Sequence, residues 1–151
     1  MNDRKRNLKT VRDCALTLLE YCDRTEQEMR RKLKEREYTP EEIEKTIVFL
    51  KEYHYIDDDR YSQKYIHTYA DRKSIRRLRR ELEQKGVSRE RIDAALDEIT
   101  VDESMQIAVW IQKKGYMPGE HLDPDQYRKL MAGLGRRGYS FDTIRRVMDG
   151  D

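Results

Sequence analysis

Apolar residues recur along this chain at helical spacing, in a pattern that is repeated three times. Three segments align with one another without a gap, and each has five apolar residues at the same offsets. These are Met29, Leu33, Tyr38, Ile43 and Ile47; then Leu78, Leu82, Val87, Ile92 and Leu96; and finally Leu130, Leu134, Tyr139, Ile144 and Met148. A period of about 50 residues is typical of stacked supersecondary units. The sequence therefore predicts a repeat protein.

Each aligned segment predicts two helices joined by a tight turn. Gly86 and Gly138 follow the first of these helices, where a residue in the left-handed conformation commonly ends a helix. Glu37 has the same position in the first repeat, at some cost in backbone strain. The next helix starts after a hydroxyl that can accept a hydrogen bond from a free helix amide, and these hydroxyls belong to Thr39, Ser88 and Ser140.

Capping signals also mark the start of the first helix in the first two pairs. Thr25 with Glu28 predicts a capping box, and Ser74 has the place equivalent to Thr25 in the second repeat. A second box is predicted at Thr39 with Glu42, after which the helix continues through an apolar face.

An additional helix is predicted ahead of each pair. Its apolar stripes are Val11, Ala15, Leu18 and Leu19; Tyr61, Tyr65, Ile66 and Tyr69; and Met105, Ala108 and Ile111 with neighbouring Trp110. No segment alternates for long enough to predict a strand. Helices of about twelve residues are marginal alone, so each must pack on its neighbours. We expect an all-α fold of three tandem three-helix repeats that form an elongated, curved rod. The expected boundaries are a basic N-terminal arm at 1–9 and repeats at 10–56, 57–100 and 101–151.

The composition implies a thin core and one basic region. Charged residues make up 41% of the 151 residues and hydrophobic ones 36%, while the net charge is only +2. Over residues 72–91, however, nine basic residues stand against three acidic ones. The chain has neither the apolar core of a signal peptide nor a run of about 20 apolar residues that could span a membrane. We expect a cytoplasmic protein and a monomer in solution.

Several motifs that could indicate catalysis or ligand binding have simpler explanations. "GLGRRG" at 133–138 matches the dinucleotide fingerprint, but it ends a predicted helix instead of opening one. "DDD" at 57–59 is better explained as a helix N-terminal cap than as a metal site. Cys14 and Cys22 are about 12 Å apart on one helix, too far for a disulfide, and are expected to be buried free thiols. His54, His67 and His121 are isolated in sequence. We expect no cofactor, no metal and no enzymatic activity.

The basic stretch around residue 76 is the best candidate for a binding surface. On a helix, Ile75, Leu78 and Leu82 share one face, so the arginines at 76, 77 and 80 point away from the core. A solvated helix face would also explain such a pattern, and Arg77 can pair with Glu81 at four residues' spacing. The proposed partner-binding residues are Arg72, Lys73, Arg76, Arg77 and Arg80.

The tyrosines at 61, 65 and 69 lie among basic residues, and aromatic side chains in such a setting can stack on single-stranded nucleic acid. The same spacing also fills a helix core. Because the other two leading helices carry mainly aliphatic residues on comparable stripes, the core interpretation is favoured.

With its repeat and its motifs, the chain resembles the RecX family of regulators of the bacterial RecA recombinase. The similarity rests on "YHYIDDDRYSQKYI" (53–66), "RRLRRELEQKGVSRERIDAAL" (76–96) and "RKLMAGLGRRGYSFDTIRRVM" (128–148). The chain departs from the family in the "DRKS" turn and in lacking a glycine at position 37.

The resemblance implies a non-enzymatic protein that binds in the groove of the RecA–DNA filament. There it would inhibit ATP hydrolysis, strand exchange and the coprotease activity that cleaves the repressor, and so limit homologous recombination, DNA repair and the SOS response. The alternative is a helical module that binds single- or double-stranded DNA directly. Whether DNA is contacted alongside RecA is left open by the sequence.

Overall fold

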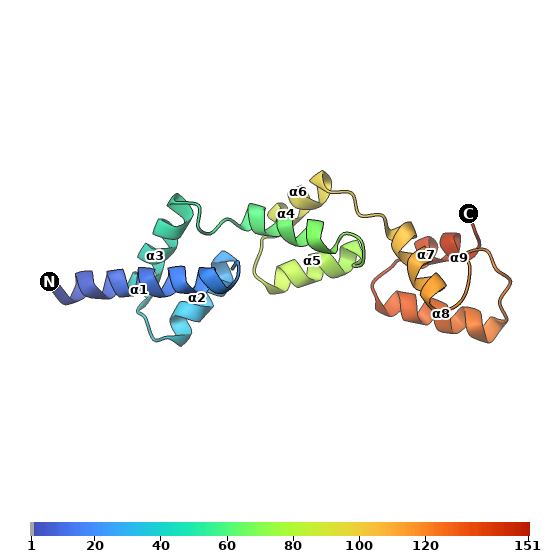
Figure 1. The fold of residues 1–151 in the computed structure, drawn as a ribbon, viewed down its shortest axis with the longest axis horizontal. Coiled ribbons are helices and arrows are strands. Elements are labelled where there is room, and N and C mark those ends of the chain that lie inside the picture. The colour runs from blue at the N-terminus through green and yellow to red at the C-terminus, as the bar shows by residue number, and fades with distance from the viewer. Residues whose placement is uncertain (1) are drawn as a thin grey trace. The chain divides into compact units, whose positions relative to one another are not determined.

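The computed structural model describes the backbone of residues 2–151 and the side chains from Thr10 onward. The basic arm expected at 1–9 therefore falls on residues whose side chains lie outside the described set. Over the described residues the fold consists of nine helices without a strand, as predicted (Figure 1). The helices are α1 (Asn2–Tyr21), α2 (Glu26–Glu35), α3 (Pro40–Glu52), α4 (Asp58–Tyr69), α5 (Ile75–Gln84), α6 (Arg89–Glu98), α7 (Glu103–Lys113), α8 (Pro124–Arg136) and α9 (Phe141–Met148).

The predicted N-terminal caps are present. The Thr25 hydroxyl accepts the Glu28 amide at 3.1 Å, and the Glu28 carboxylate accepts the Thr25 amide at the same distance, which completes the capping box. At Thr39 only the hydroxyl half of the predicted box is recorded, with the Glu42 amide donating at 3.2 Å. Serine hydroxyls cap α5, α6 and α9 in the same way, from Ser74, Ser88 and Ser140.

The turns after α2, α5 and α8 share one backbone conformation. In each, the residue two positions past the helix has a positive φ: 67° at Glu37, 87° at Gly86 and 97° at Gly138. The amide after it donates to a carbonyl five residues back, as from Tyr38 to Leu33 at 3.3 Å. This is the Schellman arrangement, which satisfies the last carbonyls of a helix. The predicted left-handed caps are confirmed in all three repeats.

Two of these turns also contact the start of a helix from the preceding repeat. The Thr25 hydroxyl donates to the Lys85 carbonyl at 2.5 Å, just before Gly86. The Ser74 hydroxyl donates to the Arg137 carbonyl at 2.9 Å, just before Gly138. The same repeat-to-repeat contact therefore occurs twice, once between the first and second repeats and once between the second and third.

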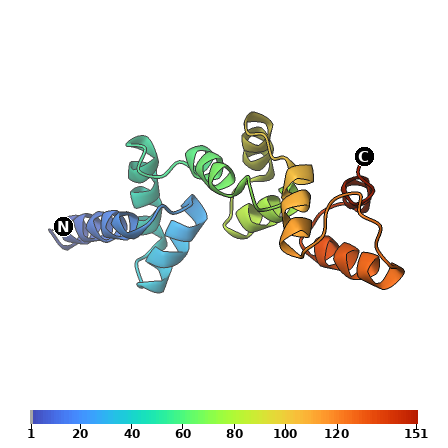
Figure 2. The ribbon, with the colours of Figure 1, turned by 45° about the vertical axis from the view of Figure 1, so that its right-hand side comes forward.

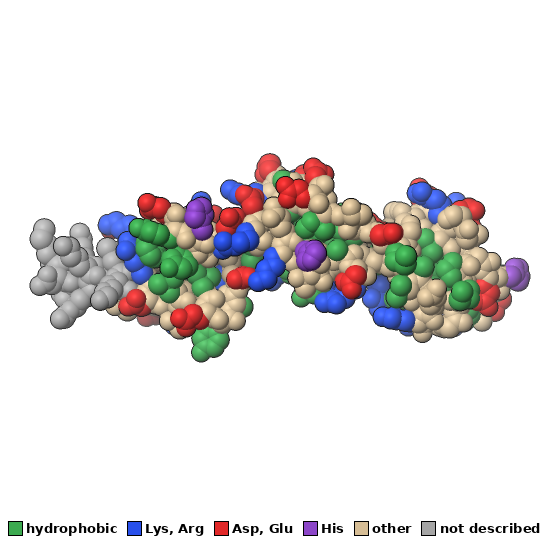
Figure 3. Space-filling model, turned by 45° about the horizontal axis from the view of Figure 1, so that its top comes forward, with side chains coloured by type: hydrophobic (Ala, Val, Ile, Leu, Met, Phe, Trp, Pro, Cys, Tyr) green, Lys and Arg blue, Asp and Glu red, His purple; other side chains and the backbone are tan. Residues whose placement is uncertain are grey.

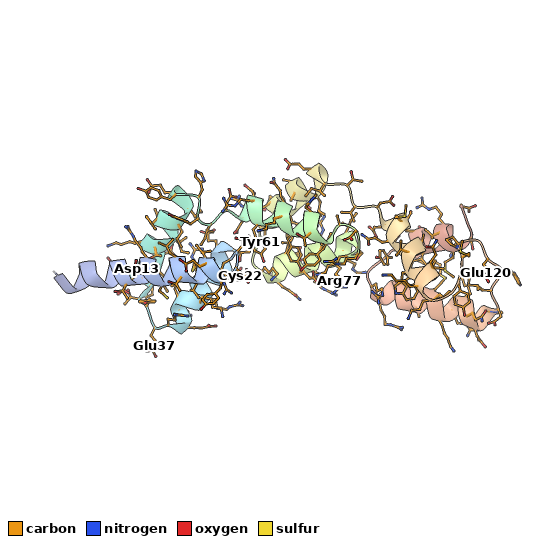
Figure 4. The ribbon with its side chains drawn as sticks, in the orientation of Figure 1. Asp13, Cys22, Glu37, Tyr61, Arg77 and Glu120 are labelled. Atoms are coloured by element: carbon orange, nitrogen blue, oxygen red, sulfur yellow. The ribbon has the colours of Figure 1, made fainter. Side chains whose placement is uncertain are left out.

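This contact explains why two of the turns have glycine and one does not. A Cβ at Gly86 would collide with the Gln27 side chain, and one at Gly138 would lie 2.7 Å from Ser74 Oγ. Glu37, in contrast, is exposed at the turn after α2 (Figure 4). Its turn therefore requires a left-handed backbone but has room for a side chain, so a glutamate is tolerated there.

By its internal contacts the chain divides into two compact units, and both take part of the second repeat. The first unit runs to Lys64 and includes Leu82–Asp93, and the second comprises Tyr65–Glu81 and Ala94–Asp151. In the first unit, α1 and α2 both pack against α3 (Figure 1). In the second, α7 and α8 both pack against α9, and the two views of the ribbon agree on this grouping (Figure 2).

The cores consist of the residues that the repeat predicts. Among the aligned positions, Tyr38 and Leu96 are half-buried and all the others are buried. The first unit has a cluster of Val11, Ala15, Leu18, Met29, Leu33, Ile43, Ile47, Leu50 and Ile56. The second has one of Ile107, Ile111, Leu130, Leu134, Tyr139, Ile144, Val147 and Met148.

Two expectations about buried residues are wrong. Met105 is 61% exposed, because Met105 and Ile111 are six residues apart and so lie on different faces of a helix. The buried face of α7 is formed by Gln106, Ile107 and Ile111. Cys22 follows the end of α1 and is exposed, whereas Cys14 is half-buried beside the core. None of the helices described over residues 2–151 combines the length and apolar character needed to cross a membrane.

Candidate interaction surface

The five predicted partner-binding residues fall into two groups, and the first group surrounds Glu81 on α5. Lys73 Nζ lies 2.8 Å from the Glu81 carboxylate, and Arg77 Nε lies 3.1 Å from it. The hydroxyl of Tyr65 also donates to Glu81. The Lys73 side chain is only 14% exposed, and its ammonium lies 3.8 Å from the ring centre of Tyr69. Lys73 is therefore held inside a polar cluster of the protein itself.

The cluster changes the proton affinity of Glu81. Burial alone would raise the pKa of this carboxyl, but hydrogen bonds from Lys73, Tyr65 and Arg77 outweigh burial and lower the pKa to about 2. Glu81 is therefore ionised at neutral pH and balances one of the two positive charges that Lys73 and Arg77 bring. The ion pair that the sequence predicts between Arg77 and Glu81 is confirmed.

The second group is exposed. Arg72, Arg76 and Arg80 follow one another at four-residue spacing, and the structure records no ion pair for Arg76 or Arg80 within its described part. The Arg72 guanidinium lies 5.0 Å from the ring centre of Tyr69. These arginines are the part of the predicted site that remains available to a ligand.

Two tyrosines of α4, Tyr65 and Tyr69, contact basic residues of this region. Tyr65 and Tyr69 are half-buried instead of fully in the core, and their ring centres are 4.8 Å apart. Because their faces contact Lys73 and Arg72, the two rings hold the basic residues of the chain itself. The expectation of a core position is thus only partly correct for these residues.

A basic pocket that the sequence analysis missed lies between α5, α7 and α8. It has a volume of about 460 Å³ and contains five cationic side chains but a single carboxylate, that of Glu81. Its lining consists of Arg77, Arg80, Glu81, Trp110, Lys114, Gly133, Arg136 and Arg137. The pocket thus brings Arg77 and Arg80 together with basic residues of the third repeat. Arg77, in the first turn of α5, is labelled in Figure 4.

The added cations come from helix ends. Lys114 is the C-terminal cap of α7, Arg136 is the last residue of α8, and Arg137 caps that helix. Positive charge at a helix C-terminus is favourable, which gives these residues a structural role as well. Over the face shown in Figure 3, acidic and basic side chains are intermixed, whereas the lining of the pocket has an excess of positive charge.

The remaining sequence motifs have structural roles. The first carboxylate of "DDD", Asp57, accepts the amides of Asp59 and Arg60 at 3.0 and 3.1 Å and so caps α4. "GLGRRG" forms the end of α8, whereas a dinucleotide fingerprint lies at the start of a helix. Within the described residues no group of three histidine, cysteine or acidic side chains is arranged to hold a metal ion. Fold and surface together define a helical-repeat protein with a basic patch around α5.

Comparison with known proteins gives the family. The models of the first, second and third three-helix domains of RecX match residues 12–50, 57–96 and 102–148. Together they cover most of the chain, one per repeat. The chain belongs to the RecX family.

Individual relatives agree with this assignment. The regulatory protein RecX of Cronobacter sakazakii is 35% identical, over 89% of this chain and 88% of the relative. That of Clostridioides difficile is 30% identical, over 89% of this chain but 65% of its own length. Among solved structures, the RecX of Lactobacillus salivarius has a TM-score of 0.79 at 21% identity and 97% coverage of both chains. A second regulatory protein RecX has a TM-score of 0.78 at 26% identity, covering 95% of this chain and 73% of the other.

Proposed function

We propose that this protein is a non-enzymatic regulator that binds in the groove of the RecA–DNA filament and inhibits the recombinase. Inhibition would extend to ATP hydrolysis, strand exchange and repressor cleavage, and would limit recombination, DNA repair and the SOS response. The proposal rests on membership of a family whose curated relatives are named regulatory proteins. A partner assembled on chromosomal DNA also implies that the protein acts in the cytoplasm.

The observation that carries the proposal for the site is the exposure of Arg76 and Arg80. Both project from α5 on the side away from buried Leu78 and Leu82. Ion pairs with Glu81 occupy the neighbouring Lys73 and Arg77, so these two residues hold the local structure. Exposed guanidinium groups suit an acidic protein surface or phosphate, because they donate several hydrogen bonds in a fixed plane.

The experiment replaces Arg76 and Arg80 together by glutamate. Arginine and glutamate have similar helix propensity and the core residues are untouched, so circular dichroism should change little. If the charges are buried at the interface, reversing them weakens binding by about 2–5 kcal/mol. The concentration needed to inhibit recombinase ATPase on single-stranded DNA should then rise about 30-fold or more.

The matched control is Arg128→Glu, on α8. Arg128 is 78% exposed, pairs with exposed Asp125 and does not line the basic pocket. Arg137 is unsuitable as a control because it lines the same pocket as Arg80. Inhibition by the double variant that equals inhibition by the parent protein would refute the proposed site.

The alternative, direct binding to DNA, makes a different prediction. A direct binder has the same affinity for bare single-stranded DNA as for DNA coated with recombinase and a non-hydrolysable nucleotide. Its affinity also falls with salt by a logarithmic slope of about −0.7 per phosphate contact. A filament regulator prefers the coated strand. Measuring both affinities over a range of salt concentrations separates the two functions.

A further inference from the structure

The basic pocket contains the one tryptophan of the chain, Trp110. Trp110 is a half-buried residue of α7, and its ring packs against α8 at Gly133. A Cβ at Gly133 would lie 2.9 Å from the ring atom Cη2 of Trp110. Glycine inside a helix is unfavourable, and here it allows the indole to approach the helix backbone. The sequence around Gly133 is thus adapted to the position of this ring.

Positive charge surrounds the indole. The Lys114 ammonium lies 5.3 Å and the Arg137 guanidinium 5.5 Å from the ring centre, and Arg80 and Arg136 complete the lining of the pocket. The structure records no ion pair for Lys114 or Arg136 in the part of the chain that it describes. The carboxylate of the pocket, Glu81, is already paired with Lys73 and Arg77. The pocket therefore has unbalanced positive charge next to an aromatic ring.

We propose that the basic pocket binds a nucleotide unit, with its phosphate against Lys114, Arg80 and Arg136 and its base against Trp110 and Arg137. Arginine and lysine donate hydrogen bonds to phosphate oxygens, and bases stack on aromatic rings and on guanidinium planes. The volume of about 460 Å³ is within the range of small-ligand sites. An acidic peptide would use the cations but would not need the indole.

A second pocket that shares Trp110 and Arg137 is less suited to a phosphate. It has a volume of about 670 Å³, and the cations of its lining, Arg72, Lys113 and Arg137, are largely offset by the carboxylates Asp71 and Asp102. Its excess of positive charge is therefore smaller than that of the basic pocket. The charge distribution thus directs the phosphate to the side of α5 and α8.

This binding differs from that of a dinucleotide fold, since no helix N-terminus takes part. It also does not depend on the proposed function, because the pocket would bind a nucleotide in the absence of recombinase. The nucleotide could come from a single strand or be free in solution, and the chemistry of the pocket is the same for both.

The test uses the fluorescence of the single tryptophan in the full chain. The protein is titrated with a dT oligonucleotide of about ten nucleotides, with adenosine triphosphate, with inorganic phosphate and with polyglutamate. We expect saturable quenching by the oligonucleotide, by the free nucleotide or by both, and the stronger ligand identifies the source. Equal or stronger binding of polyglutamate, or no saturable change with either nucleotide ligand, would overturn the proposal.

The variant Lys114→Gln with Arg136→Gln localises the binding, because it leaves Arg76 and Arg80 intact. Its affinity for the nucleotide ligand should fall about tenfold or more. The matched control, Lys113→Gln with Arg128→Gln, removes the same charges from α7 and α8 outside the pocket and should bind like the parent protein. Equal loss in both variants, or loss in neither, would refute the pocket.

Measuring recombinase inhibition by the parent protein and by Arg76→Glu with Arg80→Glu keeps this inference separate from the proposed function. If nucleotide binding fails while Arg76→Glu with Arg80→Glu still abolishes inhibition, only the pocket is wrong. If nucleotide binding is lost in the pocket variant and the parent protein does not inhibit the recombinase at all, only the filament proposal is wrong.

Discussion

Replacing Gly138 by alanine tests the repeat-to-repeat contact most directly. Gly138 has a φ of 97° and follows the carbonyl that accepts the Ser74 hydroxyl. An alanine Cβ there would lie 2.7 Å from Ser74 Oγ, closer than the two atoms can approach. The substitution therefore affects the backbone of one repeat and the cap of a helix in another.

The expected loss has two parts. A non-glycine residue in the left-handed conformation costs about 1–2 kcal/mol. Displacing Ser74 weakens its hydrogen bond to the Arg137 carbonyl, and a bond of this kind contributes about 0.5–1.5 kcal/mol. Because the Ser74 hydroxyl also caps α5, its side chain cannot move away from the new Cβ without losing that cap as well. We expect Gly138→Ala to lower the free energy of unfolding by about 2–3 kcal/mol.

The measurement is urea denaturation followed by circular dichroism, in which the midpoint should fall by about 1 M or more. Gly135→Ala is the first comparison. Gly135 is inside α8 with open space around its Cβ position, so alanine there should stabilise by about 0.5–1 kcal/mol. Glu37→Gly is the second. Relief of strain at a φ of 67° is partly offset by greater freedom of the unfolded chain, so a change between zero and about 1 kcal/mol of stabilisation is expected.

The order of the three variants decides the outcome. If Gly138→Ala is as stable as the parent protein, the turn is not left-handed or the contact with Ser74 does not form. If Glu37→Gly is strongly destabilising, the first turn has a constraint that the exposed position of Glu37 does not explain.

Two further predictions concern the core and the Glu81 cluster. Leu33→Ala, Leu82→Ala and Leu134→Ala should each destabilise by roughly 2–5 kcal/mol, because all three side chains are fully buried at equivalent positions. Thermal melts that show no loss for any of them would contradict the alignment of the repeats. Glu81→Gln should destabilise at neutral pH, by on the order of 3 kcal/mol as an upper bound from a pKa of about 2 against an ordinary value of 4.5. Since the folded pKa is the lower one, this contribution is complete above pH 4.5 and is lost as the pH falls towards 2, so the stabilities of parent and variant should converge there. A difference that stays constant over this window would exclude an electrostatic role for Glu81.

The sequence was sufficient to predict the helices and their order. Helical periodicity and caps are local properties, and a hydroxyl such as Thr25 or Ser140 needs only the amide three residues later. The repeat identified the core positions, because three aligned copies show each apolar position three times. Two predictions of burial failed. Met105 was assigned to the apolar stripe of its helix but is exposed, and Cys22 was assigned to a helix that ends one residue before it. The elongated, curved shape stays a prediction.

The arrangement of the basic residues around α5 was only half predictable. The sequence shows that residues 72–80 are basic, and helical geometry directs Arg76 and Arg80 outward. It could not show that Lys73 returns to Glu81, because that ion pair depends on how the turn before α5 folds. The ion pair of Arg77 with Glu81 could be predicted, because both residues lie on one helix at four-residue spacing.

What the sequence by itself determined was thus the local structure: nine helical segments over the described residues, most of their caps and buried faces, and the family. What only the tertiary structure decided was which distant residues meet. Trp110, Lys114 and Arg136 come from a different repeat than Arg80, and nothing in their local sequence marks them as its neighbours. The same holds for Gly86 and Gly138, whose need for glycine comes partly from Gln27 and Ser74 in the preceding repeat. Periodicity reports the face that a helix buries, whereas contacts between repeats depend on packing that no local pattern encodes.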